Sequence, residues 1–116
     1  MNKHETINYL EIPSSDLVKT QEFFEVVFGW EFESYGTEYL AFKSETIEGG
    51  FFKSKLISRA SNGSVLIVFY SANLEESLEK VVSKGGVISE SIFSFPGGRR
   101  FHFQDPVGNE FAVWSE

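Results

Sequence analysis

The pattern of hydrophobic and polar positions runs through the same order twice along the 116-residue chain. A strand-forming segment at 7–12 precedes a helical pattern that stops at Gly29, and a second strand-forming segment at 65–70 precedes a helical pattern that stops at Gly85-Gly86. Glycine ends a helix readily because it adopts the left-handed conformation without strain. The repetition predicts one supersecondary unit used twice.

Polar residues at matching places predict where the helices begin. Ser15 or Asp16 opens the first helix and Asn73 opens the second, because each side-chain oxygen can accept a free backbone N–H of the first turn. Pro13 is expected to end the strand before the first helix, since proline donates no ladder hydrogen bond. The apolar stripes expected to face the core are Leu17, Phe24, Val27 and Phe28 in the first helix and Leu74, Leu78, Val81 and Val82 in the second.

Short strands are expected after each helix, separated by turns rich in glycine. In the first copy they are 30–34, 38–43 and 50–55, with turns at Tyr35-Gly36 and Glu48-Gly49-Gly50. In the second copy they are 87–90, 99–104 and 110–115, and 92–95 is either a further short strand or the lead-in to a turn at 96–98. Residues 58–64 are expected to link the copies.

Composition narrows the class of protein. An apolar fraction of 41% and 13 phenylalanines are typical of one folded domain rather than of a disordered chain. The net charge of −7 argues against nucleic-acid binding, which needs clustered Lys and Arg, and the absence of cysteine excludes disulfides and thiol catalysis. The sequence has no apolar run that could span a membrane and no signal-peptide core, so a cytoplasmic location is expected.

Two motifs give the chain a family resemblance. The first is Phe103-Gln104-Asp105-Pro106-Val107-Gly108-Asn109, in which Asp105 to Asn109 are expected to turn between two strands. In the second, Tyr9-Leu10-Glu11-Ile12-Pro13 is followed by Asp16 and by Val27-Phe28-Gly29-Trp30. Together with the duplicated unit, these motifs resemble the vicinal oxygen chelate (VOC) superfamily, which includes glyoxalases, extradiol dioxygenases, fosfomycin-inactivating enzymes and bleomycin-binding proteins. The resemblance implies a single α+β domain over 1–116. Its two βαβββ modules, about 5–57 and 65–116, would curl into a cup and pair as homodimers.

The resemblance also bears on metal binding. Metal-using members place His, Gln or Glu on the concave sheet face, and the corresponding positions here fall on Tyr9, Leu66 and Ala112, with a fourth around 49–52. Leu66 and Ala112 offer no donor atom, and a tyrosine phenol, with a pKa of about 10, is a poor ligand at neutral pH. The two histidines are far apart in sequence and form no ligand spacing. We therefore expect no divalent metal and no other cofactor.

Strand alternation gives the side chains expected to line the cup. Residues two positions from Tyr9 or Ala112 on the same strand point inward with them, and intervening residues are left for the core. Glu11 and His102 are the candidate catalytic groups for proton transfer, and Arg100 is the candidate clamp for a substrate carboxylate. The other expected ligand-binding residues are Tyr9, Leu66, Val68, Tyr70, Gln104, Glu110 and Trp114, and the residues left for the core are Phe101, Phe103, Phe111 and Val113.

Simpler roles are open for several of these residues. Glu11 and Arg100 can form a surface ion pair, His102 can be an ordinary half-exposed strand residue, and Tyr9 with Trp114 can fill the cup. Three functions remain for a chain whose expected partners are a small molecule and a second copy of itself, but no nucleic acid or membrane. They are a metal-free binding protein, a metal-independent lyase or isomerase that uses Glu11 and His102, and a metal-dependent lyase of the lactoylglutathione lyase type.

Overall fold

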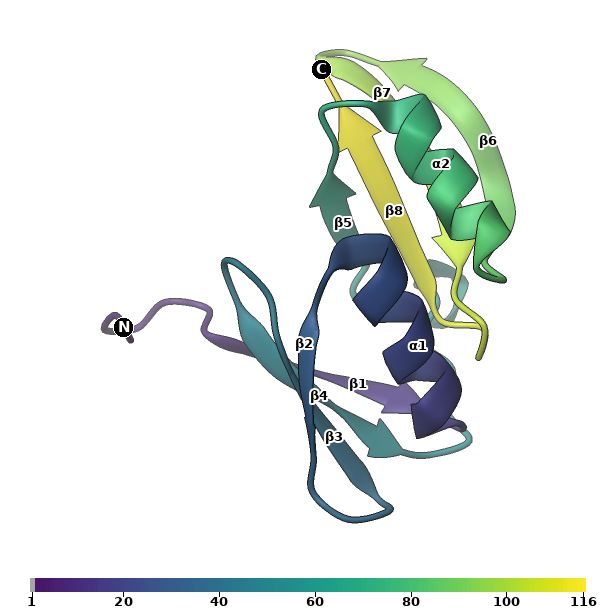
Figure 1. Cartoon of the computed structure of the whole chain (residues 1–116). Coiled ribbons are helices and arrows are strands. Elements are labelled where there is room, and N and C mark those ends of the chain that lie inside the picture. The colour runs from purple at the N-terminus through teal and green to yellow at the C-terminus, as the bar shows by residue number, and fades with distance from the viewer. Residues whose placement is uncertain (1) are drawn as a thin grey trace. The chain divides into compact units, whose positions relative to one another are not determined.

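The computed structural model describes residues 2–116 and divides the chain into two compact units, Met1–Leu56 and Ile57–Glu116. Each unit is a four-stranded sheet with one helix along one of its faces (Figure 1). The predicted α+β fold of two βαβββ units is therefore confirmed. We call the face opposite the helix the helix-free face of each sheet.

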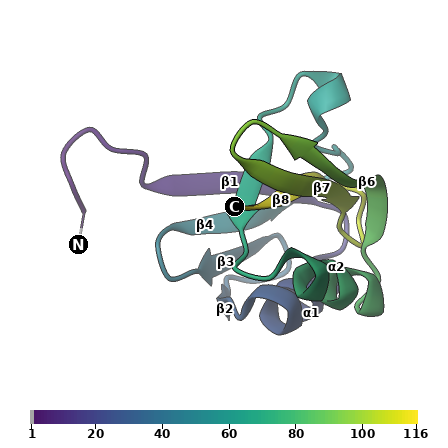
Figure 2. The same ribbon diagram turned by 90° about the horizontal axis from the view of Figure 1, so that it is seen from above.

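The first unit contains β1 (Tyr9–Ser14), α1 (Leu17–Phe28), β2 (Glu31–Ser34), β3 (Tyr39–Lys43) and β4 (Glu48–Lys53). Its strand order is β1-β4-β3-β2, in which β1 runs parallel to β4 and the other neighbours are antiparallel. The exposed residues 2–8 extend away from the sheet of this unit (Figure 2). The first strand therefore begins two residues later than predicted.

The second unit repeats the first. It contains a short 3-10 helix η1 (Ala60–Asn62), β5 (Ile67–Tyr70), α2 (Leu74–Ser83), β6 (Val87–Phe95), β7 (Gly98–Gln104) and β8 (Glu110–Ser115). Its order is β5-β8-β7-β6, with β5 parallel to β8, so each strand occupies the place of its counterpart in the first unit. The segments predicted at 87–90 and 92–95 join into one strand, β6, whose pairing with β7 shifts register twice.

The duplication extends to the residues that begin the helices. Asp16 has φ −147° and ψ 95°, and Asn73 has φ −141° and ψ 94°. Each side chain accepts the backbone N–H three residues further on, from Lys19 at 3.1 Å and from Glu76 at 3.2 Å. Each cap satisfies one of the N–H groups that a helix leaves free at its start, which contributes about 1 kcal/mol. Of the two candidates for the first cap, Asp16 is the one used.

A serine two residues before each cap forms a second repeated contact. The Oγ atoms of Ser14 and Ser71 accept the N–H of their cap residues at 3.2 and 3.0 Å. Each serine also bonds a hydroxyl near the start of its helix, that of Thr20 at 2.7 Å in the first unit and that of Ser77 at 2.6 Å in the second. Ser14 and Thr20 are fully buried, so each of these hydroxyls needs a partner within the protein.

An aromatic stack forms the core of the first unit. The Trp30 ring lies between Phe24 of α1, at a centroid distance of 4.7 Å, and Phe42 of β3, at 4.2 Å, with interplanar angles of 14° and 10°. Phe51 of β4 is fully buried, and its ring centroid lies 5.5 Å from those of Phe24 and Phe42. Aromatic rings in contact bury large apolar areas, so this stack fixes α1 on the sheet.

The core of the second unit lies between α2 and its sheet. Leu74 and Val81 of α2 are buried, as predicted, but Val82 is 50% exposed. The prediction for Val82 was wrong because it lies about 100° around the helix from Val81, outside the narrow buried stripe of this short helix. The sheet contributes the four side chains that alternation assigned to the core, Phe101, Phe103, Phe111 and Val113.

Pro13 does not end the first strand, contrary to the prediction. It lies inside β1, opposite Phe52 of β4, and the strand continues to Ser14. Because β1 is an edge strand, a residue without an N–H is tolerated on its outer side.

The glycines at 49 and 50, predicted in a turn, lie in strand β4 and are buried. A Cβ on Gly49 would overlap the carbonyl oxygen of Leu10 and the ring of Phe42, and a Cβ on Gly50 would overlap the phenol of Tyr39. These glycines are therefore required because a ring crosses β4 on each face of the sheet. Sequence alone did not separate this use of glycine from a turn.

Candidate functional site

Tyr9 and Glu11 lie on the helix-free face of the first sheet, and Tyr39 of β3 joins them. The Tyr39 hydroxyl donates to Glu11 Oε2 at 2.9 Å and lies 2.6 Å from the Tyr9 hydroxyl. Burial, together with the hydrogen bonds to Tyr9 and Glu11, raises the pKa of Tyr39 well above its ordinary value. The Tyr39 phenol therefore keeps its proton at neutral pH, and the Tyr9 hydroxyl donates to its oxygen.

The other eight predicted site residues belong to the second unit. Opposite residues of a sheet ladder share a face, and Ala112 of β8 lies opposite both Val68 of β5 and His102 of β7. Leu66, which was predicted within the strand, lies just before β5. The predicted residues gathered on the helix-free face of the second sheet are Val68, Tyr70, Arg100, His102, Gln104, Glu110 and Trp114.

His102 and Glu110 form a hydrogen-bonded pair on this face. His102 is 6% exposed, which rules out the half-exposed alternative, and its Nδ1 lies 3.0 Å from Glu110 Oε2. Glu110 Oε1 accepts the backbone N–H of Ala60 at 2.9 Å. That bond, and next the bond to His102, lower the pKa of Glu110 against the opposing effect of burial. An ionised Glu110 accepts Nδ1–H of His102, whose buried Nε2 has no hydrogen-bond partner within residues 2–116.

Arg100 lies beside two phenylalanines of β6 that the sequence analysis did not include. Its Cζ is 5.3 Å from the ring centroid of Phe93 and 5.8 Å from that of Phe95, within the range of cation–π attraction. The Phe93 ring lies 5.9 Å from the His102 ring, and the Phe95 ring lies 6.3 Å from the Trp114 ring. Alternation within the segment 92–95 was the available signal, because it places both phenylalanines on one face.

The turn between β7 and β8 is held by its own first residue. Asp105 Oδ1 accepts the N–H of Val107 at 3.2 Å and the N–H of Asn109 at 2.9 Å. Burial raises the pKa of the Asp105 carboxyl to about 6, although these backbone hydrogen bonds act in the opposite direction. Its second oxygen, Oδ2, is buried with no hydrogen-bond partner within residues 2–116. The buried carboxylate of Asp105 is therefore a source of pH-dependent stability.

Residues 58–64, predicted as a linker, are bonded to this turn. Ser58 N–H donates to Asn109 Oδ1 at 2.8 Å, and Arg59 Nε donates to the carbonyl oxygen of Gly108 at 3.0 Å. Arg59 Nη2 also donates to Gln104 Oε1 at 3.2 Å. The segment thus belongs to the second unit, and the side-chain oxygen of Gln104, a predicted ligand-binding residue, is engaged by Arg59.

Two surface hollows lie in the first unit. One, of about 480 Å³, is lined by residues from 2–9 and 43–48. The other, of about 450 Å³, is lined mainly by residues from 15–21 and 34–40. Tyr9 is the only one of the ten predicted site residues that lines either of them. The candidate site on the second sheet is therefore argued from the contacts of its side chains and not from either hollow.

Comparison with known protein families shows which superfamily the chain belongs to. The family model described as Glyoxalase/Bleomycin resistance protein/Dioxygenase superfamily matches residues 6–113. The chain belongs to this superfamily. The resemblance seen in the sequence motifs is confirmed. A comparison with curated proteins by sequence gives no match.

Solved structures of this superfamily share the fold. A glyoxalase/bleomycin resistance protein/dioxygenase family enzyme from Burkholderia phytofirmans PsJN aligns with a TM-score of 0.77 at 13% identity, over 93% of this chain and 96% of that one. Lactoylglutathione lyase from Agrobacterium tumefaciens aligns with a TM-score of 0.73 at 19% identity, over 97% and 95%. Fosfomycin resistance protein FosX from Mesorhizobium loti aligns with a TM-score of 0.77 at 17% identity, over 98% and 94%. At these identities the similarity shows the fold alone.

The metal site expected in metal-using members of the superfamily is not matched by the residues of this chain. Within residues 2–116 no group of three or more His, Cys, Asp or Glu side chains is placed to hold an ion. The Tyr9 hydroxyl is bonded to Tyr39, and Leu66 and Ala112 have no donor atom. The donor set does not fit a divalent ion, and no step proposed below uses one.

None of the helices within residues 2–116 is long and apolar enough to cross a membrane.

Proposed function

We propose that this superfamily member binds a small molecule on the helix-free face of its second sheet without a divalent ion. The arrangement around Arg100 carries the proposal. A charged side chain lies among the rings of Phe93, Phe95 and Trp114, next to the His102–Glu110 pair. Small-molecule sites combine apolar walls with a few polar groups that fix the orientation of the ligand.

Tryptophan fluorescence provides the test of binding. The chain has two tryptophans, Trp30 in the core of the first unit and Trp114 beside Phe95 in the second. In a Trp30→Phe variant, emission therefore reports on the candidate site. We expect at least one compound from a panel of small polar aromatics to change this emission to saturation. The same Kd is expected in the presence of EDTA, because no ion takes part.

The matched control is Trp114→Phe, in which the remaining tryptophan lies in the first-unit core and its emission should not respond. Binding that EDTA abolishes and that Mn²⁺ or Zn²⁺ restores would contradict the metal-free proposal. A panel in which no compound binds would contradict binding at this face.

The His102–Glu110 pair favours a second function, that of a metal-independent lyase or isomerase. Glu110 accepts Nδ1–H, so in this tautomer the lone pair that would take a proton from a carbon next to a carbonyl lies on Nε2 of His102. This atom is buried, so a bound substrate must displace the groups that cover it. For an α-hydroxy carbonyl compound, the electron pair of the broken C–H bond moves onto the carbonyl oxygen and gives an enediolate. His102 then returns the proton to the former carbonyl carbon, while the hydroxyl proton passes to the former carbonyl oxygen and the hydroxyl-bearing carbon becomes the new carbonyl. Glu11, the other group proposed for proton transfer, accepts a hydrogen bond from Tyr39 in the first unit.

Proton exchange tests this second function. In D₂O, the protein is expected to catalyse deuterium incorporation next to the carbonyl of a small α-hydroxy carbonyl compound, followed by NMR. His102→Gln should slow the exchange by about 100-fold or more, since a general base contributes about that factor. Arg99→Gln, on the other face of β7, should leave it unchanged. No exchange above the uncatalysed rate with the unaltered protein would exclude this function for the compounds tried.

We further propose a homodimer and a cytoplasmic location. The homodimer is supported by the edge strand β5, on which Val68 is 43% and Tyr70 is 54% exposed. The cytoplasmic location rests on the sequence alone.

A further inference from the structure

We propose that the helix-free face of the second sheet selects an aromatic carboxylate, whose anionic group is held by Arg100. The proposal rests on the function proposed above and names the chemical class of its ligand. It follows from two features of this face. Within residues 2–116 the Arg100 guanidinium has no anionic partner, and a row of aromatic rings lies beside it.

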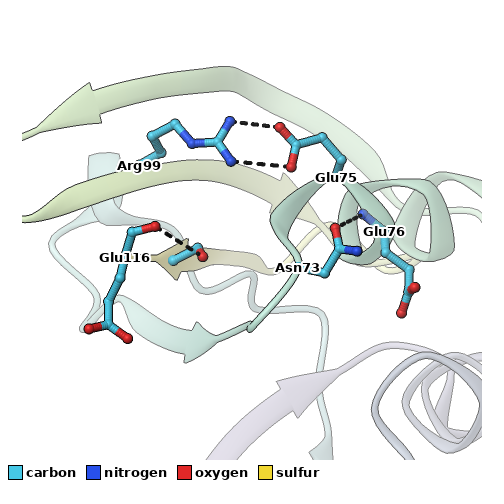
Figure 3. A network of polar contacts seen from close by, with 6 residues as sticks. Asn73, Glu75, Glu76, Arg99 and Glu116 are labelled. Atoms are coloured by element: carbon cyan, nitrogen blue, oxygen red, sulfur yellow. Dashed lines mark hydrogen bonds and ion pairs between the residues drawn. The ribbon is translucent and has the colours of Figure 1, made fainter.

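Comparison of the three arginines identifies the unpartnered one. Arg99 forms two parallel hydrogen bonds to Glu75 of α2, at 2.6 and 3.2 Å (Figure 3). Arg59 donates to the carbonyl oxygen of Gly108 and to a side chain of the same unit. Arg100 takes part in none of the ion pairs found within residues 2–116, and its Nε is buried without a hydrogen-bond partner. A buried donor in this state is costly until a ligand satisfies it.

The carboxylates of β8 and its end already have other partners. Glu110 accepts from the backbone of Ala60 and pairs with His102, and Glu116 accepts the Tyr70 hydroxyl at 2.8 Å. Glu90 of β6 lies opposite His102, but it forms none of the ion pairs found within residues 2–116, and none of those pairs includes Arg100. We infer that the anion that would complete Arg100 comes from outside the chain. A carboxylate fits best, because its two oxygens match the planar fork of the guanidinium.

The rings beside Arg100 indicate the rest of the ligand. Phe93 and Phe95 lie against the guanidinium, Phe95 lies 6.3 Å from Trp114, and the Trp114 ring lies 5.1 Å from that of Tyr70. This row of rings offers an extended apolar surface to a flat ring system, which aromatic side chains contact through offset or edge-on packing. An aromatic carboxylate combines the anion and the flat ring in one small molecule.

Three probes separate these two parts of the proposal. Benzoate has the ring and the charge, benzamide has the ring without the charge, and acetate has the charge without the ring. By calorimetry, benzoate is expected to bind at least about tenfold more tightly than either of the others. In ¹⁵N-correlated NMR spectra, benzoate should move the Nε–H signal of Arg100 among the three arginine signals.

Variants on the two faces of β7 give the matched control. Arg100→Gln should weaken benzoate binding by about tenfold or more, and Arg100→Lys, which keeps the charge but loses the fork, should weaken it by less. Arg99→Gln should leave it unchanged, because residues 99 and 100 point to opposite faces. The Lys variant keeps the test usable if the Gln variant does not fold.

The outcomes distinguish this proposal from the binding function itself. Equal binding of benzamide and benzoate overturns the carboxylate, and equal binding of acetate overturns the aromatic ring. Benzoate binding that does not depend on Arg100 overturns its role. If benzoate fails while another panel compound binds at Trp114, the ligand class is wrong and the binding function stands. If no compound binds, both are wrong.

Discussion

Replacement of Gly49 by alanine is expected to destabilise the first unit by about 3 kcal/mol or more. The added Cβ would overlap the carbonyl oxygen of Leu10, and this backbone atom cannot move without breaking the pairing of β1 with β4. The entropy gained from a stiffer unfolded chain is at most about 1 kcal/mol and does not offset the clash. Urea unfolding followed by Trp30 emission, in a Trp114→Phe background, measures the stability of the first unit.

Gly50→Ala is the matched comparison, because its Cβ would overlap a side chain, the phenol of Tyr39, and not the backbone. Alone it should cost about 1–3 kcal/mol. In a Tyr39→Ala background the cost should fall to well under 1 kcal/mol, because the ring that crosses Gly50 is gone. If Tyr39→Ala brings no relief, the crossing ring is not the reason for glycine at this position.

The difference in unfolding free energy between the wild type and Asp105→Asn is expected to change by about 3 kcal/mol between about pH 4 and pH 7. The pKa of the Asp105 carboxyl rises from 3.8 to about 6 on folding, and each pKa unit corresponds to roughly 1.4 kcal/mol. Because the folded-state pKa is the higher one, the contribution of Asp105 to stability is fully present below about pH 4 and is lost as the pH rises through about 6. Asparagine does not titrate, so the wild type should lose stability relative to the variant as the pH rises.

The comparison of Asp105→Asn with the wild type isolates this carboxyl from other titrating groups. Asparagine keeps the Oδ1 atom that accepts from Val107 and Asn109, so the turn retains its hydrogen bonds. Urea unfolding at several pH values, followed by Trp114 emission in a Trp30→Phe background, gives the difference in unfolding free energy. Glu110→Gln is the control of opposite sign, because the pKa of Glu110 is lowered by folding and its contribution is lost as the pH falls. A constant difference between Asp105→Asn and the wild type across this range would contradict the prediction.

The features of the fold that sequence predicted are those with local causes. The cap at Asp16, the stop at Gly29 and the buried stripe around Phe24 depend on residues within one or two helical turns, and the structure has all three. Pro13 and Gly49 were assigned wrongly because their places depend on neighbouring strands. Proline is tolerated where the strand is at an edge, and glycine is required where a ring from the next strand crosses. Neither condition can be inferred from the residues that flank Pro13 or Gly49 in the sequence.

The candidate site was predictable along strands but not across them. Alternation placed Arg100 and His102 on one face, and the pairing of β7 with β8 agrees. Tyr39 and Phe93 were missed because their contacts depend on the register between strands, which alternation does not give. Arg59 was missed because it reaches Gln104 and Gly108 from the irregular segment before η1. The pairing of His102 with Glu110 likewise depends on two strands meeting in one register.

The matched hydroxyls at the helix starts show which residue chemistry the two units share. Ser14 with Thr20 and Ser71 with Ser77 occupy equivalent positions, although the two halves of the sequence differ at most other places. A serine before the helix and a hydroxyl six residues further on therefore form a common lock for the entry into each helix, and loss of either hydroxyl should loosen that entry alone.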